Sequence, residues 1–172
     1  LRPPAQRLSG PLVLLQAGRV SADKGVHTAV EALGILVREY GAGALRLCIA
    51  GSGPADYLAA LRDQAERAGV AGLVEFLGWQ PRQAMPALMA RGHVLLLPSV
   101  HEEAFARVVL EAMAAGLAVV GTLAGGTGEV LQHETTGLAF AAGDSASLAA
   151  QIGRLLDEPD LRLRLATAGQ QL

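Results

Sequence analysis

The sequence predicts an α/β domain: a Rossmann-like, doubly wound parallel sheet of about six strands with helices on both faces. Short apolar runs bounded by Gly or Pro alternate with longer segments in which apolar residues recur at helical spacing. This alternation repeats five or six times, and strands joined through helices form parallel sheets that are covered on both sides. Hydrophobic residues make up 51% of the 172 residues, which is enough for a sizeable core.

The predicted strands are brief, apolar segments of the kind that a covered sheet buries. Strands of this type need no alternation of polar and apolar residues, because both of their faces are covered. In chain order they are Leu12–Gln16, Leu45–Ala50, Val74–Leu77, His93–Leu97, Ala118–Gly121 and, as the sixth, Gly137–Phe140.

The predicted helices lie between these strands. Val26, Val30, Leu33 and Val37 recur at helical spacing, which predicts a helix over Gly25–Tyr40. Pro159 is suited to the first turn of a last helix that stops near Gly169. Similar patterns predict helices over Pro54–Ala68, Arg82–Ala90, Ala106–Ala115 and Ser145–Asp157.

Composition excludes several functional classes. The net charge is −2, without a basic cluster, and aromatic residues are few, so nucleic-acid binding is disfavoured. No apolar run approaches the roughly 20 residues that span a bilayer, so we expect no transmembrane segment. Cys48 stands alone in an apolar segment, which excludes a disulfide framework, favours a core position and fits a reducing cytoplasm.

The residues that follow each strand are the candidates for a binding site. In open parallel sheets, ligands bind at the carboxyl ends of the strands, where the turns into the helices gather. No internal linker or repeat is apparent, so we expect residues 12–172 to form one domain. Residues 1–11, which precede the first predicted strand, are expected to be an N-terminal linker segment. The candidate turns are Gly18–Lys24, Gly51–Pro54, Gly78–Arg82, Pro98–Arg107 and Thr122–Glu129.

The turn after the first strand carries Arg19 and Lys24, the latter being the only lysine of the chain. A helix start attracts anions through its free N–H groups and its dipole. Two cations beside it would make a site for a diphosphate, with a forked contact from the arginine and a point contact from the lysine. The alternative is a pair of solvated charges on a loop.

Two acids, Glu103 and Glu111, follow the fourth strand. Eight residues of helix would separate them by about 12 Å, whereas a glycosidase pair stands about 5 to 9.5 Å apart. They are therefore expected to contact different parts of one long ligand. Glu111 has apolar neighbours, and on the buried side of a helix it would need donors such as those of a ribose diol. The alternative is an acid on the exposed stripe of the helix.

Two glycine-rich turns are less specific. Gly51-Ser52-Gly53-Pro54 opens like a dinucleotide fingerprint, but Asp56 stands at the third glycine position, so a tight turn explains it as well. The run 124–129 would let a backbone approach a ligand closely, or it forms a flexible loop. No metal-ligand spacing and no nucleophile elbow are found, so we expect neither a metal nor a cofactor.

Together these motifs resemble the C-terminal domain of the retaining glycosyltransferases called group 1, or family 4, with the two-domain GT-B architecture. The resemblance extends from Leu12 to about Gly169. Its strongest element is the Glu-x7-Glu signature from Glu103 to Glu111, which continues as Glu-Ala-Met-Ala-x-Gly. Arg19 with Lys24, Ile-Ala-Gly-Ser-Gly-Pro, Phe-Leu-Gly, Leu-Pro-Ser and Gly125-Gly126 with Glu129 stand around it in the family's order.

The resemblance implies a nucleotide-sugar donor site and metal-independent transfer with retention. By this resemblance, Arg19 and Lys24 hold the donor diphosphate, Glu111 binds the ribose hydroxyls and Glu103 contacts the donor sugar. Catalysis would fall to Glu103, Arg19 and Lys24. The further donor-binding positions are Gly18, Gly51, Gly78 (with backbone groups after it for the base) and the phosphate-facing stretch of Ala104, Phe105, Ala106 and Arg107.

The same resemblance places the acceptor site, for a sugar, a lipid or another small molecule, in an N-terminal domain that these 172 residues lack. We therefore expect little transfer by this chain alone, and a cytoplasmic enzyme, peripheral at the inner membrane face in its full length. Ala104 and Ala106 stand where the family often has glycine. They leave open a second function, a non-catalytic nucleotide or nucleotide-sugar module. A third alternative is another GT-B enzyme such as a sugar-nucleotide epimerase.

Overall fold

A computed structural model describes residues 10–101 and 107–172. Six strands form one sheet: β1 (Leu12–Ala17), β2 (Leu45–Ala50), β3 (Val74–Gly78), β4 (Val94–Leu97), β5 (Ala118–Gly121) and β6 (Leu138–Ala139). The α-helices are α1 (Val26–Tyr40), α2 (Ala55–Arg67), α3 (Met85–Arg91), α4 (Arg107–Ala114), α5 (Ser145–Asp157) and α6 (Pro159–Gln170). Four 3₁₀ turns lie at Ala22–Lys24, Ala71–Leu73, Arg82–Ala84 and Gly125–Glu129.

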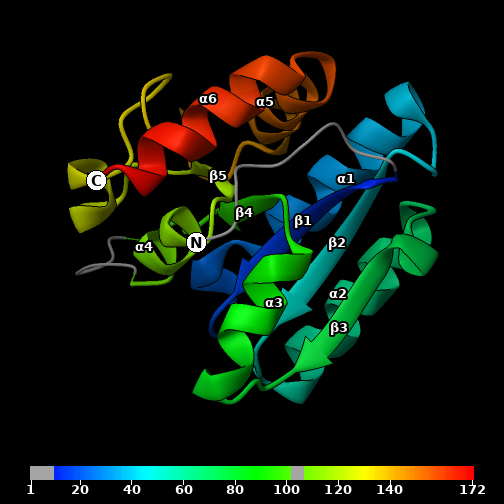
Figure 1. Cartoon of the computed structure of the whole chain (residues 1–172). Coiled ribbons are helices and arrows are strands. Elements are labelled where there is room, and N and C mark those ends of the chain that lie inside the picture. The colour runs from blue at the N-terminus through cyan, green and yellow to red at the C-terminus, as the bar shows by residue number, and fades with distance from the viewer. Residues whose placement is uncertain (1–9, 102–106) are drawn as a thin grey trace.

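The strands are parallel and stand in the order β3-β2-β1-β4-β5-β6 (Figure 1). The chain moves outward from β1 to β3, then returns to the other side of β1 with β4 and moves outward again. The order therefore reverses between β1 and β4, and the turns after these two strands diverge to opposite faces. In a doubly wound sheet this switch point is where a ligand binds. The predicted fold class is confirmed.

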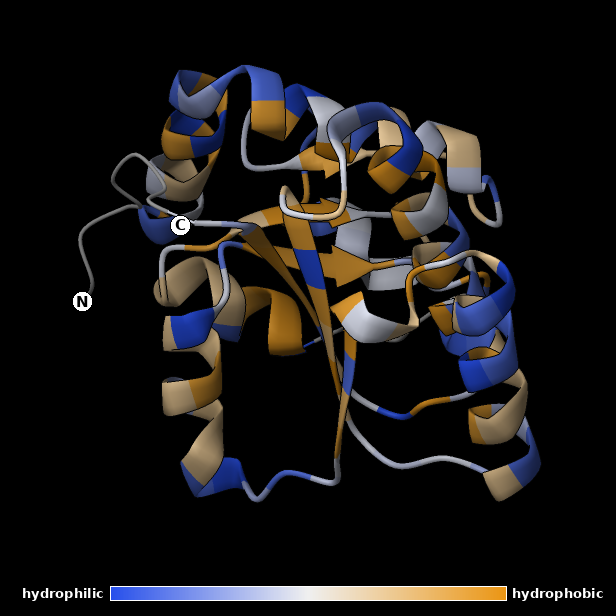
Figure 2. Ribbon diagram, turned by 90° about the vertical axis from the view of Figure 1, so that its right-hand side faces the viewer, coloured by the Kyte–Doolittle hydropathy of each residue, from blue (hydrophilic) through white to orange (hydrophobic). Residues whose placement is uncertain are grey.

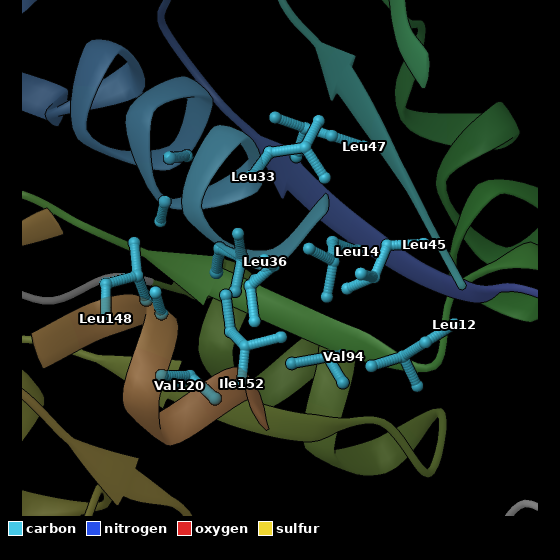
Figure 3. Close-up of a cluster of buried hydrophobic side chains, with 14 of the residues drawn as sticks. Leu12, Leu14, Leu33, Leu36, Leu45, Leu47, Val94, Val120, Leu148 and Ile152 are labelled. Atoms are coloured by element: carbon cyan, nitrogen blue, oxygen red, sulfur yellow. The ribbon is translucent and has the colours of Figure 1, made fainter. Parts of the chain in front are cut away.

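Both faces of the sheet are covered, because side chains of one strand alternate between two apolar cores. Leu12 and Leu14 of β1 pack with α1 and α5, whereas Leu15 packs on the opposite face with α3 and α4. Figure 3 shows the larger core, in which Leu33 and Leu36 of α1 meet strand side chains and Ile152 of α5. In Figure 2 the strands are mostly coloured as hydrophobic, while the outer helices carry hydrophilic segments.

The predicted elements differ from the observed ones mainly at their ends. The predicted third helix, Arg82–Ala90, begins as a 3₁₀ turn and becomes α3 only at Met85, with Pro86 near its start. The strand predicted from His93 begins at Val94, and the His93 ring accepts a hydrogen bond from the Val13 N–H at 2.9 Å. Ala106, the predicted start of the fourth helix, lies outside the described residues. Within them, no helix is long and apolar enough to cross a membrane.

Candidate functional site

The turns at the carboxyl edge of the sheet are joined by backbone hydrogen bonds. The Gly18 N–H donates to the Ala50 carbonyl at 2.9 Å, and the Gly51 N–H donates to the Gly78 carbonyl at 2.8 Å. The Val100 N–H, beyond β4, donates to the Asp23 carbonyl at 2.9 Å. The ends of four neighbouring strands are thereby held in one rigid edge.

Two adjoining cavities open on this edge, and we call them together the edge cleft. The larger, of 570 Å³, lies over β1, β2 and β3, and the smaller, of 250 Å³, lies over the switch point between β1 and β4. Both are lined by Ala17, Gly18, Arg19, Arg107 and Val108. The larger cavity adds Ala50, Gly51, Ser52, Trp79, Gln80, Arg82, Met85 and Glu111; the smaller adds Gln16, Lys24, Leu96, Leu97, Pro98 and Ser99.

The Gly51 turn lines the larger cavity. Gly51 has φ +151°, and a Cβ on it would clash with the carbonyl oxygen of Gly18. The glycine is therefore required by the close approach of two turns, which supports the tight-turn interpretation of Gly51-Ser52-Gly53-Pro54 over a dinucleotide fingerprint.

The edge cleft gathers four cations, Arg19, Lys24, Arg82 and Arg107. Arg19 is 66% exposed, and its Nη2 lies 3.2 Å from Oδ2 of Asp23 in the same turn. The nearby Ser21 hydroxyl lowers the pKa of Asp23 below its ordinary value, and the charges of Arg19 and Lys24 lower it further. Asp23 is therefore ionised at neutral pH, and it offsets part of the positive potential that Arg19 presents.

Gln16 lies under the smaller cavity and keeps an unused acceptor. The side chain is buried, and its Nε2 donates to the Lys24 carbonyl at 3.2 Å, which fixes the amide against the turn that carries the lysine. Its Oε1 has no hydrogen-bond partner within the described chain. A ligand hydroxyl or a water in the cavity would satisfy this oxygen.

Glu111 lies on the exposed face of α4, so the expectation that it is buried is wrong. Val109, Ala112 and Met113 occupy the side of α4 that packs on the sheet, and Glu111 projects from the other side. That face borders the edge cleft, where Glu111 lines the larger cavity together with Arg19 and Arg107. The alternative interpretation, in which Glu111 lies on the exposed stripe of the helix, is therefore correct, and this exposed stripe faces the larger cavity.

The turn after β3 was predicted as the candidate turn Gly78–Arg82, but none of its side chains was given a role. Trp79, Gln80, Arg82 and Met85 all line the larger cavity, and Trp79 is 71% exposed. The signal was present in the sequence, because the only tryptophan of the chain lies in this turn, two residues after the predicted strand Val74–Leu77. A large aromatic side chain in water at a strand's carboxyl end indicates a binding surface.

The structure brings together Gly18, Arg19, Lys24, Gly51, Arg107 and Glu111 of the predicted site residues. Gly78 ends β3 next to the cavity residue Trp79. Glu103, Ala104, Phe105 and Ala106 lie outside the described residues. The glycine-rich run forms a 3₁₀ turn around buried Thr127 rather than a loose loop, and it does not line the edge cleft. Among described residues, no three His, Cys, Asp or Glu side chains cluster as metal ligands do.

The chain is similar to known proteins over almost its whole length. A sequence model described as "Glycosyl transferases group 1" matches residues 2–172. The glycogen synthase of Mycobacterium tuberculosis is 39% identical over 164 residues, covering 95% of this chain and 38% of that protein. The α-D-kanosaminyltransferase of Streptomyces kanamyceticus is 31% identical over 157 residues, covering 90% of this chain and 39% of that protein. The chain thus spans about two fifths of the length of these relatives.

The fold of the chain is also similar to that of solved glycosyl transferase structures. The Anabaena protein HepE in complex with UDP-glucose superposes with a TM-score of 0.86 at 29% identity, covering 94% of this chain and 43% of that one. The C-terminal domain of a group 1 glycosyl transferase from Francisella tularensis superposes with a TM-score of 0.85 at 23% identity, covering 93% of this chain and 83% of that one.

Proposed function

The chain belongs to the group 1 glycosyl transferases, and we propose that its edge cleft binds the nucleoside diphosphate of a nucleotide-sugar donor. The observation that carries this proposal is the meeting of Arg19, Arg107 and Glu111 around one cavity at the carboxyl ends of β1, β2 and β3. A nucleoside diphosphate has a charged end and a sugar diol, and these side chains offer a partner for each. The Anabaena complexes with UDP and UDP-glucose support this ligand class.

The diphosphate is assigned to the part of the cleft shared by both cavities. Arg19 and Arg107 line both of them, and Lys24 lines the smaller one beside Pro98 and Ser99. Arginine binds phosphate oxygens in a forked manner, and lysine adds a compact charge. The start of α4, which begins at Arg107 among the described residues, adds the positive end of a helix dipole.

The ribose and the base are assigned to the larger cavity. Glu111 there offers two acceptor oxygens for the ribose hydroxyls. Trp79 and Gln80 follow Gly78 and line the same cavity, so a base lying there would meet an aromatic ring as well as the backbone.

We further propose that the reaction is transfer of a hexosyl group with retention and without a metal. Negative charge develops on the nucleoside diphosphate as it leaves, and Arg19, Lys24 and Arg107 are placed to stabilise it. These three cations would supply the positive charge that a divalent ion supplies in other transferases. Glu103, assigned to the donor sugar by the resemblance, remains a prediction.

The acceptor, which would be a sugar, a lipid or another small molecule, is assigned to a part of the protein outside this chain. The chain spans only about two fifths of the length of its relatives. We therefore propose that the 172 residues bind the donor but transfer little alone. We propose a cytoplasmic protein, which the free thiol of Cys48 supports. In its full length we propose that it is peripheral at the inner membrane face.

Calorimetric titration with UDP, GDP and ADP in the presence of EDTA tests the donor site. We expect saturable binding of one nucleotide and loss of at least tenfold in affinity in an Arg19→Ala, Lys24→Ala double variant. Arg38→Ala is the matched control, because Arg38 is an exposed cation in the last turn of the 15-residue α1, about 20 Å along that helix from the cleft. Equal binding by the double variant, or no binding to the parent chain, would contradict the proposal.

A further inference from the structure

A separate cavity lies at the opposite edge of the sheet from the edge cleft. Its volume is 500 Å³, and it is bordered by the beginnings of β1 and β2 and by the junction of α5 with α6. A six-residue strand such as β1 puts about 17 Å between its first and last residues, and therefore between the two edges of the sheet. This cavity and the edge cleft share no lining residue. The lining residues are Gly10, Leu12, Ala44, Leu156, Pro159, Asp160 and Arg162.

Arg162 is a buried cation without a partner. Its side chain is 2% exposed, its Nε has no hydrogen-bond partner, and no ion pair to it occurs within residues 10–101 and 107–172. Burial lowers the pKa of the guanidinium, but an arginine keeps its proton at neutral pH. A buried, unpaired charge is costly, so buried arginines are ordinarily paired with an anion.

The first turn of α6 adds further donors beside Arg162. Pro159 occupies the first turn, and the Arg162 N–H makes an early intrahelical bond, to the Glu158 carbonyl at 3.2 Å. The N–H groups before it, at Asp160 and Leu161, have no acceptor within the helix. Glu158 does not cap them with its side chain, because its Oε1 lies 3.8 Å from Nε of Arg154.

We propose that Arg162 and the first turn of α6 form a second oxyanion site, which takes a phosphate or carboxylate group into the cavity at the amino edge of the sheet. The guanidinium supplies the charge, and the amides of Asp160 and Leu161 supply two directed donors. The site is independent of donor binding, because none of its residues lines the edge cleft.

Asp160 limits the affinity of this site. It lines the same cavity and is exposed, yet its carboxylate makes no ion pair with Arg162. It therefore leaves the guanidinium unneutralised while it repels an incoming anion. Asp160→Asn should strengthen phosphate binding by about two- to fivefold, as expected for the loss of one exposed like charge.

The test is an NMR titration of the ¹⁵N-labelled 172-residue chain with inorganic phosphate in one arm and acetate in the other, at constant ionic strength. We expect saturable shifts of the Asp160 and Leu161 amides, in the phosphate arm if the site takes phosphate and in the acetate arm if it takes carboxylates. Amides of Arg19 and Lys24 report the edge cleft separately, so failure of either site is visible on its own.

Arg162→Met should weaken these shifts at least tenfold, while Arg164→Met should leave them unchanged. Arg164 is the matched control, because it lies on the same helix but is exposed and donates to the Glu134 carbonyl at 2.8 Å. The proposal is overturned if neither anion gives a saturable shift up to about 50 mM, or if Arg162→Met leaves the shifts intact. The proposal is also overturned if Asp160→Asn lowers the melting temperature without raising the affinity for phosphate. Asp160 would then be the stabilising ionic partner of Arg162.

Discussion

Arg19 and Asp23 form an ion pair of 3.2 Å within the turn that follows β1, and Arg19 lines both cavities of the edge cleft. The two side chains are 66% and 35% exposed, so the pair itself adds little to folding stability. The ion pair is instead expected to affect the affinity for a ligand. Asp23 holds the guanidinium beside the cleft and subtracts from the charge that a diphosphate would meet.

Asp23→Asn should therefore tighten nucleotide binding. Removing one exposed carboxylate near a diphosphate is worth up to about 1 kcal/mol, or up to roughly fivefold in affinity, and the gain should shrink as salt is added. Calorimetry at two salt concentrations measures both effects. Glu39→Gln, an exposed acid near the end of α1, should change nothing. Weaker binding by Asp23→Asn would mean that Asp23 is needed to orient Arg19.

Trp79 should report nucleotide binding directly. It is the only tryptophan, it is 71% exposed, and it lines the cavity assigned to the base. Stacking of a base on an aromatic ring is worth about 1 to 3 kcal/mol, and it should quench or shift the emission of this one fluorophore. Trp79→Ala should weaken binding roughly fivefold or more, whereas Trp79→Phe keeps most of it. An unchanged emission spectrum at saturating nucleotide would place the base elsewhere.

Gly51→Ala should destabilise the fold and damage the edge cleft together. The new Cβ would meet the Gly18 carbonyl, and φ is +151°, so one of the two turns must move. A loss of about 2 to 4 kcal/mol in the free energy of unfolding is expected from such a clash. Gly43→Ala is the control, because nothing lies within 4 Å of its Cβ position and its φ is not positive. Urea unfolding compares the two, and similar losses would refute the role given to Gly51.

The thiol of Cys48 should be nearly inert in the folded chain. Burial, followed by its contact with Glu75, raises the pKa of Cys48 to about 11. At pH 8 only about one thiol in a thousand is then ionised, and alkylation should be at least 100-fold slower than in guanidinium. The native rate should rise about tenfold per pH unit up to about pH 11, because the thiolate fraction does. Equal rates in folded and unfolded chain would contradict the buried position.

The fold could be predicted from sequence because each strand is a separate apolar run with a clear boundary. Leu12, Leu45 and Val94 lie in such runs, and all three are fully buried in the larger core. Helix starts were harder to predict. Arg82 and Met85 both fit a helical pattern, but the chain makes a 3₁₀ turn before α3, and periodicity does not distinguish one turn type from the other.

The site could be predicted only in part, because its contacts join turns far apart in the chain. Arg19 and Lys24 were found from their charge beside a helix start, and the parallel topology then brings them to Arg107. Trp79 was missed because a single exposed aromatic has no periodic signal. The wrong burial of Glu111 has a similar cause: its apolar neighbours Leu110 and Met113 differ in burial, with Leu110 41% exposed and Met113 buried.

Because Glu111 is exposed, replacing it tests the donor site without disturbing the core. Val109, Ala112 and Met113 hold α4 on the sheet, so replacing Glu111 removes a cleft side chain and no core contact. Glu111→Ala should therefore leave the melting temperature within about 2 °C of the parent, since exposed substitutions alter stability by about 0.5 kcal/mol or less. Any larger effect on nucleotide affinity is then an effect on the ligand.

If Glu111 binds the ribose, its loss should remove the preference for ribose over deoxyribose. A carboxylate that accepts from two hydroxyls loses a charged hydrogen bond when the 2′-hydroxyl is absent, which is worth about 1.5 to 3 kcal/mol. The parent chain should thus bind the ribonucleotide about 10- to 100-fold more tightly than its 2′-deoxy form. In Glu111→Ala the two affinities should converge within about threefold. A preference that survives in Glu111→Ala would assign the ribose to another group, and Gln16, with its unpartnered Oε1 in the smaller cavity, would be the next to replace.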